Sequence, residues 1–368
     1  MDGPRKIVLI LGNGFDLDLG LKTSYKDFWE SEFCPKDYPA PLIQHLNKRW
    51  SDDLEAVRWY DLENELLVYS QIENKTDLID EKQRSYIIGH SDYDLTISIR
   101  YSDIDDLFSS LVEAGIIRIT GVLRNASIPY RDDLLKSATW RDQKALELIK
   151  EGLCKYLTSI DKPIPESLTV AFHLLLSMTQ CVKAGDMVDI YTFNYTRVQM
   201  RGHSVDGIPV FYMHGSCEKG KIIVGTRDGT PMVPEYDFLQ KVMDDSFMPP
   251  DIVTALENAD EVIIFGHSLG ENDRQYFEQF FTRHASSGSL KEPFIIIFTR
   301  DSNSKKEIKR SLKSLTGDRL SLLYSANLPI IIRTGELKED QKLFFDFLIS
   351  HHTDRHYASE VIGKLLIK

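Results

Sequence analysis

Cysteine is scarce in this sequence, and no two cysteines have the spacing of a zinc site. There are four among 368 residues, they lie far apart, and none forms a C-x-x-C pair. This argues against a zinc site and against the disulfide framework of a small secreted protein. We therefore expect reduced thiols in a cytosolic protein. The four are Cys34, Cys154, Cys181 and Cys217.

Long apolar segments and excess positive charge are also missing. No window of about 18 uncharged apolar residues exists, so we expect no membrane-spanning helix. The apolar run at 7–11 is too short for a signal peptide. Lysine and arginine number 44 against 56 aspartates and glutamates, a net charge of −12. Because an acidic protein repels phosphate backbones, nucleic-acid binding is disfavoured, and we expect a cytoplasmic protein.

The size and composition are typical of a globular protein with two structural units, or with one domain and a large insertion. Short apolar runs rich in β-branched residues predict strands buried on both faces, and segments of helical periodicity separate most of them. This alternation favours an α/β fold with a doubly wound parallel sheet. The six runs are Ile7–Leu11, Val188–Phe193, Pro209–Met213, Val262–Phe265, Phe294–Phe298 and Pro329–Ile332.

Between the first two runs lies a charged, mostly helical stretch. We expect a core formed by residues 1–44 and 166–368 and a helical insertion or cap at 45–165. The insertion could serve as a lid, a surface for homo-oligomers or a face for a partner.

A glycine-rich turn follows the first run, with the sequence Gly12-Asn13-Gly14-Phe15-Asp16 and then Gly20. Such a turn between a strand and a helix can bring backbone N–H groups to a dinucleotide, or it can simply be a tight turn. Asp16 could bind a ribose hydroxyl or cap the helix. Thr23 or Ser24 could cap the next helix. The absence of G-K-[ST] excludes a P-loop.

Polar residues follow three later runs, where the carboxyl ends of parallel strands face the ligand crevice. Asn194 and Tyr195 follow the second run, and His214 follows the third. Histidine is a common general base near neutral pH. A histidine after a strand can also be structural, but the equivalent strand-end positions of Asn194 and the glycine turn favour a functional role for His214.

The segment 266–270 reads Gly-His-Ser-Leu-Gly and matches the G-x-S-x-G elbow of serine hydrolases. One interpretation makes Ser268 a nucleophile, although no downstream histidine follows a predicted strand. The other makes the segment a second nucleotide-binding turn, in which Ser268 contacts phosphate or ribose and Asp273 caps a helix or binds ribose. The downstream histidines are His284, His351, His352 and His356.

A metal-dependent phosphodiesterase or nuclease is a further alternative. Its ligands would be Asp16, Asp61, Glu63 and Asp273. Residues two apart on a helix point to different faces, however, so Asp61 and Glu63 are poorly spaced for one shared metal.

Taken together, these motifs resemble those of the sirtuins. Gly12-x-Gly14 with Gly20-Leu21 resembles the sirtuin nucleotide loop, and Thr192-Phe193-Asn194-Tyr195 resembles its Thr-Gln-Asn segment. His214-Gly215 resembles the catalytic His-Gly, and Gly266-His267-Ser268-Leu269 resembles the Gly-Thr-Ser-Leu turn. No zinc tetrad lies between His214 and Gly266, and protein deacetylation is therefore not expected.

The chain is more similar still to the bacterial abortive-infection family AbiH. The shared features are the Gly-Asn-Gly-Phe-Asp start, Phe-Asn-Tyr-Thr, His-Gly, Val224-Gly225, Gly-His-Ser-Leu-Gly and Trp59–Glu63. This resemblance implies a sirtuin-like Rossmann core and a role in defence against phage, with a phage-derived trigger. Relatives of the sirtuin fold in phage defence cleave NAD, which implies that Asn194 orients a water and that His214 acts as base on the ribose or on that water.

The resemblance also implies a nucleotide site around that pair, with NAD as substrate. Non-catalytic nucleotide sensing and another kind of hydrolysis remain open as alternatives. At Asp16, at Thr196 and over 22–25 the sequence departs from the sirtuin pattern. The expected binding residues are Gly12, Asn13, Gly14, Phe15, Asp16, Gly20, Thr23, Tyr195, Gly266, His267, Ser268 and Asp273.

Overall fold

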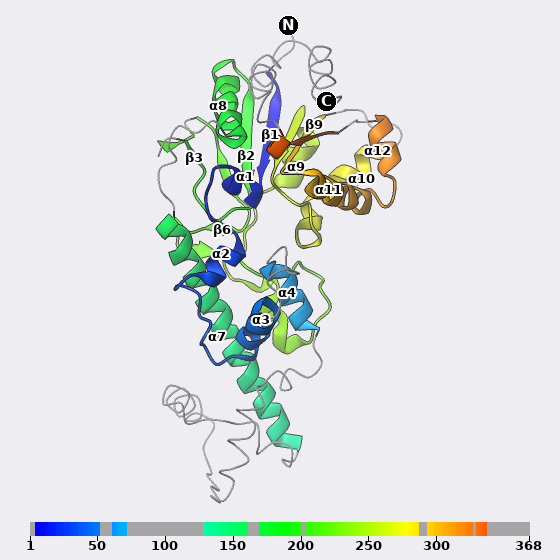
Figure 1. Cartoon of the computed structure of the whole chain (residues 1–368). Helices are drawn as coiled ribbons and strands as arrows, with labels where there is room; N and C mark the ends of the chain where they lie inside the picture. Colours follow the sequence, from blue (N-terminus) through cyan, green and yellow to red (C-terminus); the bar gives the residue numbers. More distant parts are fainter. Residues whose placement is uncertain are drawn as a thin grey trace, which may run out of the picture.

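The computed structural model describes residues 4–51, 61–71, 128–160, 169–200, 203–205, 207–286, 293–326 and 329–336. Its centre is a six-stranded sheet in which every neighbouring pair of strands is parallel (Figure 1). All six apolar runs form strands, as predicted. They are β1 (Lys6–Leu11), β2 (Met187–Thr192), β5 (Val210–Tyr212), β8 (Glu261–Phe265), β9 (Phe294–Thr299) and β10 (Ile330–Arg333).

The order of the strands reverses direction between β1 and β8. Across the sheet the order is β10-β9-β8-β1-β2-β5, which is 3-2-1-4-5-6 when these six strands are numbered along the chain and read from the β5 edge. The connections therefore reverse direction between β1 and β8. In open parallel sheets, ligands bind outside the carboxyl ends of the strands at such a reversal.

Alternate residues of each strand enter different cores, because successive side chains point to opposite faces. Ile7, Leu9 and Leu11 face helices α1 (Asn13–Asp18) and α8 (Val170–Lys183). Val8 and Ile10 face the other layer of helices. That layer contains α9 (Ile252–Asn258), α10 (Arg274–His284), α11 (Ser302–Leu315) and α12 (Leu320–Ala326).

A second group of helices lies beyond the carboxyl ends of the strands (Figure 1). It contains α2 (Tyr25–Glu30), α3 (Pro41–Ser51), α4 (Leu62–Ser70) and α7 (Ile128–Ile160). These helices share one core with the 3-10 helix η3 (Pro234–Leu239). The expected boundary at 44/45 falls inside α3, and α2 packs with this group. The division into core and insertion stays a prediction.

Asp142 connects four elements of the helical group. Its carboxylate, fully buried in α7, accepts hydrogen bonds from Leu42 N (2.8 Å), Tyr236 Oη (3.0 Å) and the Tyr69 hydroxyl. Burial raises the pKa of Asp142 to about 6. This polar centre joins α3, α4, α7 and η3.

The fold also contains several short strands and 3-10 helices. Two antiparallel pairs are β3 (Gln199–Met200) with β4 (His203–Ser204) and β6 (Gly215–Ser216) with β7 (Lys221–Ile222). Three more 3-10 helices are η4 (Lys241–Met243), η5 (Glu271–Asp273) and η6 (Thr334–Glu336). Residues 72–127 of the expected helical insertion lie outside the described residues. Among the helices described, none is long and apolar enough to cross a membrane.

Candidate functional site

The two glycine turns that follow β1 and β8 pack directly against each other. Gly12 N donates to Phe265 O (2.9 Å) and Gly14 N donates to Gly266 O (3.0 Å). A Cβ atom on Gly12 would lie 2.5 Å from the Cα of His267, and one on Gly14 would lie 2.6 Å from the Cα of Gly266. Gly266 also has a φ of +65°. Close approach of the two backbones therefore requires glycine here.

The contacts of the first turn favour a structural role for several of its residues. The N–H groups of Gly12, Gly14 and Phe15 all bind backbone carbonyls. The ring of Phe15 packs edge-on against Phe265 in the core, with centroids 5.6 Å apart. Asp16 does not cap α1, whose N-cap is Gly12, and its buried carboxylate instead accepts a hydrogen bond from Thr196 Oγ1 (2.5 Å).

The segment that follows α1 contacts the first glycine turn and caps α2. Thr23 Oγ1 donates to Asn13 Oδ1 (2.6 Å), which ties the turn to the segment before α2. Ser24, and not Thr23, caps α2 by accepting from Asp27 N (3.1 Å). Gly20 is exposed, with a φ of +84°. The structure places Asn13 and Thr23 beside the turn, so both stay candidates for ligand binding.

Asn194 and His214 lie at the same edge of the sheet, as the sequence predicts. Asn194 follows β2, and its Nδ2 donates to Gly12 O (3.1 Å), so it joins the end of β2 to the turn after β1. Tyr195 Oη donates to Ile223 O (3.0 Å) and packs in the helical core. His214 follows β5 and is only 3% exposed.

The centre of the candidate site is an ionic cluster around Lys241. Lys241 Nζ lies 3.0 Å from Glu63 Oε2, 3.1 Å from Asp273 Oδ1 and 3.2 Å from His214 Nε2. Asp273 Oδ1 also lies 3.3 Å from His214 Nε2, and Asp273 Oδ2 lies 3.2 Å from His267 Nε2. We call these five residues the lysine cluster. It joins α4, η4, η5 and the ends of β5 and β8.

The orientation of His267 follows from its two contacts. Its Nδ1 accepts a hydrogen bond from Leu269 N (3.0 Å), so the proton of a neutral ring is on Nε2. That N–H donates to Asp273 Oδ2. Asp273 was expected to cap α10 or bind ribose. It stands at the N-cap position of α10 but makes no capping hydrogen bond, because its carboxylate is directed to the lysine cluster.

Burial and charge set the protonation of the lysine cluster. Burial lowers the pKa of Lys241, but Asp273 and Glu63 outweigh that effect and raise it above its usual range. Burial and then Lys241 lower the pKa of His214 to about 3. Burial raises the pKa of Glu63 to about 8, against the attraction of Lys241. At neutral pH, Lys241 is therefore charged, His214 is neutral, and Glu63 is largely protonated.

Asp273 is the charged carboxylate of the lysine cluster. Burial alone would raise its pKa, but Lys241 and His214 hold it well below its usual range. The side chains of Glu63 and Asp273 are 12% and 14% exposed, whereas that of Lys241 is 1% exposed. Solvent therefore reaches the cluster from the side of its two carboxylates.

Sequence reasoning missed Lys241 and assigned Glu63 only as a metal ligand. Lys241 belongs to no predicted strand and to no motif. The only local signal is the nearby apolar residues, in Leu239-Gln240-Lys241-Val242-Met243. Tyr25 was missed too. It bonds to the hydroxyl of Tyr195, and burial, followed by the charge of Glu63, raises its pKa.

The geometry around Ser268 does not match a nucleophile elbow. Ser268 is exposed, and within the described part of the chain it forms no hydrogen bond with a histidine. Beside Gly266, the residue of this segment with a positive φ is Leu269 (+53°), not Ser268. His284 packs against Phe280, with ring centroids 4.6 Å apart. The later histidines, at 351, 352 and 356, lie outside the described residues.

The metal-binding alternative also lacks a ligand set. No group of three or more histidine, cysteine, aspartate or glutamate side chains suited to a metal occurs within the described ranges. The ammonium of Lys241 lies between the carboxylates of Glu63 and Asp273.

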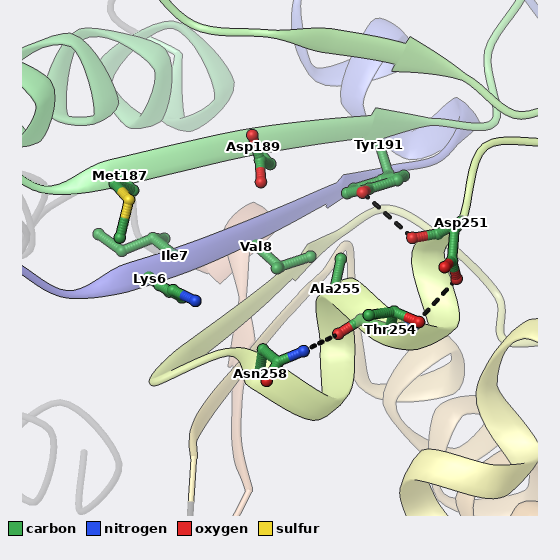
Figure 2. A pocket seen from close by; sticks show the side chains of 10 residues that line it. All are labelled: Lys6, Ile7, Val8, Met187, Asp189, Tyr191, Asp251, Thr254, Ala255 and Asn258. Carbon is green, nitrogen blue, oxygen red and sulfur yellow. Dashed lines mark hydrogen bonds between the residues drawn. The ribbon is translucent and has the colours of Figure 1, made fainter.

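A pocket of about 380 Å³ lies elsewhere, where α9 leaves part of β1 and β2 uncovered (Figure 2). No expected site residue lines it. Asn258 Nδ2 donates to Thr254 O (2.8 Å) and Thr254 N donates to Asp251 Oδ1 (3.0 Å), so these groups on the α9 side of the pocket serve the helix itself. The lining residues are Lys6, Ile7, Val8, Met187, Asp189, Tyr191, Asp251, Thr254, Ala255 and Asn258.

Comparison with known proteins assigns the chain to a family. The model of the family described as bacteriophage abortive infection AbiH matches residues 8–290, a span that contains both glycine turns and the whole lysine cluster. A search of curated proteins found no match. Because the match covers well over half of the 368 residues, the chain belongs to the bacteriophage abortive infection AbiH family.

Proposed function

We propose that this protein acts in abortive infection of phage-infected cells by hydrolysing NAD to nicotinamide and ADP-ribose. Family membership supports the defence role. The observation that carries the proposed reaction is the position of Asn194, His214 and Asp273 at the carboxyl edge of the sheet, beside the reversal of strand order. Nucleotide ligands bind at this place in doubly wound sheets, and we propose a sirtuin-like core of that type.

The charges of the site suit cleavage of the bond between nicotinamide and ribose. That bond breaks with positive charge developing on the ribose, as in glycoside hydrolysis, and a nearby carboxylate stabilises such charge. Asp273 is the charged carboxylate of the lysine cluster. Net negative charge elsewhere on the chain does not oppose this step, because the reacting centre is cationic.

Each member of the pair has a distinct part in the proposed reaction. Water attacks the ribose carbon, the carbon–nitrogen bond breaks, and nicotinamide leaves with the bonding electrons. The Nδ2 of Asn194 is held by Gly12 O, which leaves its Oδ1 to orient the water. His214, neutral at pH 7, takes the proton that the water loses.

The contact with Lys241 makes this structure a resting arrangement in the proposed reaction. A histidine with a pKa of about 3 is a weak base at neutral pH. Lys241 contributes to that low pKa, so movement of Lys241 away from His214 would raise it. We propose that a phage-derived signal, received through the helical group that supplies Glu63, makes this movement more frequent in the cytoplasm of the infected cell. The small fraction of molecules in which Lys241 moves without the signal gives the purified protein a basal activity.

The burial of His214 favours a second candidate function, a nucleotide-binding sensor without catalysis. A histidine that is 3% exposed and bonded to a lysine is poorly placed to meet substrate unless the site opens. A sensor would bind a nucleotide at the same edge and transmit the change through Glu63 and α4.

The two candidates are separated by measuring nicotinamide release and melting temperature on the same samples. We expect purified protein to release nicotinamide from NAD, and Asn194→Ala and His214→Ala to abolish release while remaining folded. His173→Ala, which changes a half-buried histidine outside the lysine cluster, is the matched control and keeps the activity. A sensor shows no release but a higher melting temperature with NAD. If millimolar NAD gives no nicotinamide release and no shift in melting temperature, both candidate functions are contradicted.

A further inference from the structure

Two cysteines from distant parts of the chain lie side by side. The sulfur atoms of Cys154 and Cys217 are 3.0 Å apart. A disulfide bond is about 2.0 Å long, so the two sulfurs need to approach by only about 1 Å. Cys154 belongs to α7, and Cys217 follows β6, three residues after His214.

The backbones that carry these cysteines are held in place by the fold. Cys217 N donates to Tyr195 O (3.0 Å), and Gly220 N donates to Cys217 O (3.0 Å), which fixes the turn between β6 and β7. On α7, Gly152 approaches the carbonyl of Phe33 too closely to allow a side chain at 152. Both cysteines border the apolar core of the helical group. Their proximity is therefore a property of the packed structure.

The chemistry of the four thiols favours this pair over the other two. Burial raises the pKa of Cys34 and of Cys181 to about 12, which keeps both thiols protonated and unreactive. A hydrogen bond with Cys217 lowers the pKa of the Cys154 thiol. Cys154 and Cys217 are half-buried, so a small oxidant can reach them.

We propose that Cys154 and Cys217 are a site of oxidative modification. The two cysteines form a reversible intramolecular disulfide when the protein reacts with a hydroperoxide. The bond ties helix α7 to the hairpin that follows His214. In a reducing cytosol the thiols are the resting state, and the disulfide forms only under oxidative stress. This site does not depend on the reaction proposed above.

The reaction balances with a peroxide as oxidant. The thiolate of Cys154 attacks a peroxide oxygen, the oxygen–oxygen bond breaks, and Cys154 becomes a sulfenic acid while one water leaves. The thiol of Cys217 then attacks the Cys154 sulfur, forms the sulfur–sulfur bond and displaces a second water. The two thiols lose two electrons and two protons, and one hydrogen peroxide is reduced to two waters. A thiol reductant reverses the step.

The test is thiol titration and peptide mapping of the full-length protein after treatment with hydrogen peroxide. We expect two of the four thiols to disappear, one Cys154–Cys217 peptide to form, and dithiothreitol to restore both thiols. Cys34→Ser and Cys181→Ser, which each keep three thiols, are the matched controls and should still lose two thiols and form the same Cys154–Cys217 peptide. In Cys217→Ser, peroxide removes only one thiol, that of Cys154, and no Cys154–Cys217 peptide forms.

Wild-type protein alone is enough to overturn the proposal, so it does not depend on the folding of a variant. Four thiols that survive peroxide, a disulfide that includes Cys34 or Cys181, or a disulfide between two chains would each contradict it. A second readout is the melting temperature. Closing a loop from 154 to 217 constrains the unfolded chain, so the oxidised protein should melt higher than the reduced one.

Discussion

Lys241 and Asp273 form a buried ion pair, with 3.1 Å between Nζ and Oδ1, that joins η4 to η5. Asp273 also contacts two histidines, and Lys241 also contacts Glu63 of the helical group. The pair therefore couples the edge of the sheet to the helices beyond it. Any movement of α4 changes the surroundings of Lys241, and through Lys241 those of His214.

Replacing Lys241 tests how much the lysine cluster contributes to the free energy of unfolding. Lys241→Met leaves Glu63 and Asp273 without their cation, and removing one partner of a buried pair costs about 3–5 kcal/mol. We expect a loss of that size in the free energy of unfolding, measured by urea titration. Lys26→Met, which breaks an exposed pair with Glu30 (3.8 Å), is the control and should cost less than about 1 kcal/mol. Equal losses in the two variants would contradict a buried cluster.

The raised pKa of Glu63 predicts how stability changes with pH. Between 4.5, its usual value, and about 8, the folded protein keeps a proton that the unfolded chain has lost. Stability from this group is therefore present below pH 4.5 and is lost as the pH rises towards 8, by at most about 1.4 kcal/mol per pH unit.

Glu63→Gln isolates this contribution, because glutamine accepts the same hydrogen bond from Lys241 without titrating. We expect the difference in unfolding free energy between wild type and variant to shift in favour of the variant as the pH rises from 5 to 8. Parallel pH profiles would mean that Glu63 is ionised in the folded protein at neutral pH.

The contact between the two glycine turns predicts a difference between two glycine substitutions. Gly266→Ala meets the backbone of Gly14 and has a positive φ, so crowding and strain together cost about 2–5 kcal/mol. Gly20→Ala has a positive φ but open space around it, so we expect about 1 kcal/mol. Urea unfolding of both variants measures the difference, and a Gly266→Ala protein as stable as Gly20→Ala would refute the close approach.

The hydrogen bonds to the carboxylate of Asp142 predict that replacing this residue, far from the candidate site, strongly lowers the stability of the fold. Asp142→Ala leaves the hydroxyls of Tyr69 and Tyr236 and the N–H of Leu42 without their acceptor, at about 1–3 kcal/mol for each buried group. Tyr236→Phe removes only one donor and should cost about 1 kcal/mol. Chemical denaturation, followed by the fluorescence of Trp29 and Trp50 in the same core, reports both losses. Similar losses of unfolding free energy in Asp142→Ala and Tyr236→Phe would contradict the role of Asp142 as a shared hydrogen-bond acceptor.

Much of the sheet could be predicted from the sequence, because a strand buried on both faces must be apolar over its whole length. Ile7–Leu11 and Phe294–Phe298 are clear examples, and both became strands. Parallel order then placed Asn194 and His214 at one edge, since both follow the carboxyl ends of strands. Helix starts were less certain, and Ser24 rather than Thr23 caps α2.

The lysine cluster could not be predicted, because its partners come from distant segments. Lys241 can be buried because the charge of Asp273 and the hydrogen bond to Glu63 offset the cost of burying its own charge, and neither residue is near it in sequence. The glycine turns show the same limit. A positive φ or a ligand could each explain Gly12, but its contact with His267 becomes visible only when β1 and β8 are neighbours.

The most direct test of this account is the rate at which the purified protein releases nicotinamide from NAD, compared with folded His214→Ala and with the control His173→Ala. The account predicts measurable release by wild type and by His173→Ala, and none by His214→Ala. Equal release by wild type and His214→Ala would contradict the proposed site, because hydrolysis would then occur without the histidine at the end of β5.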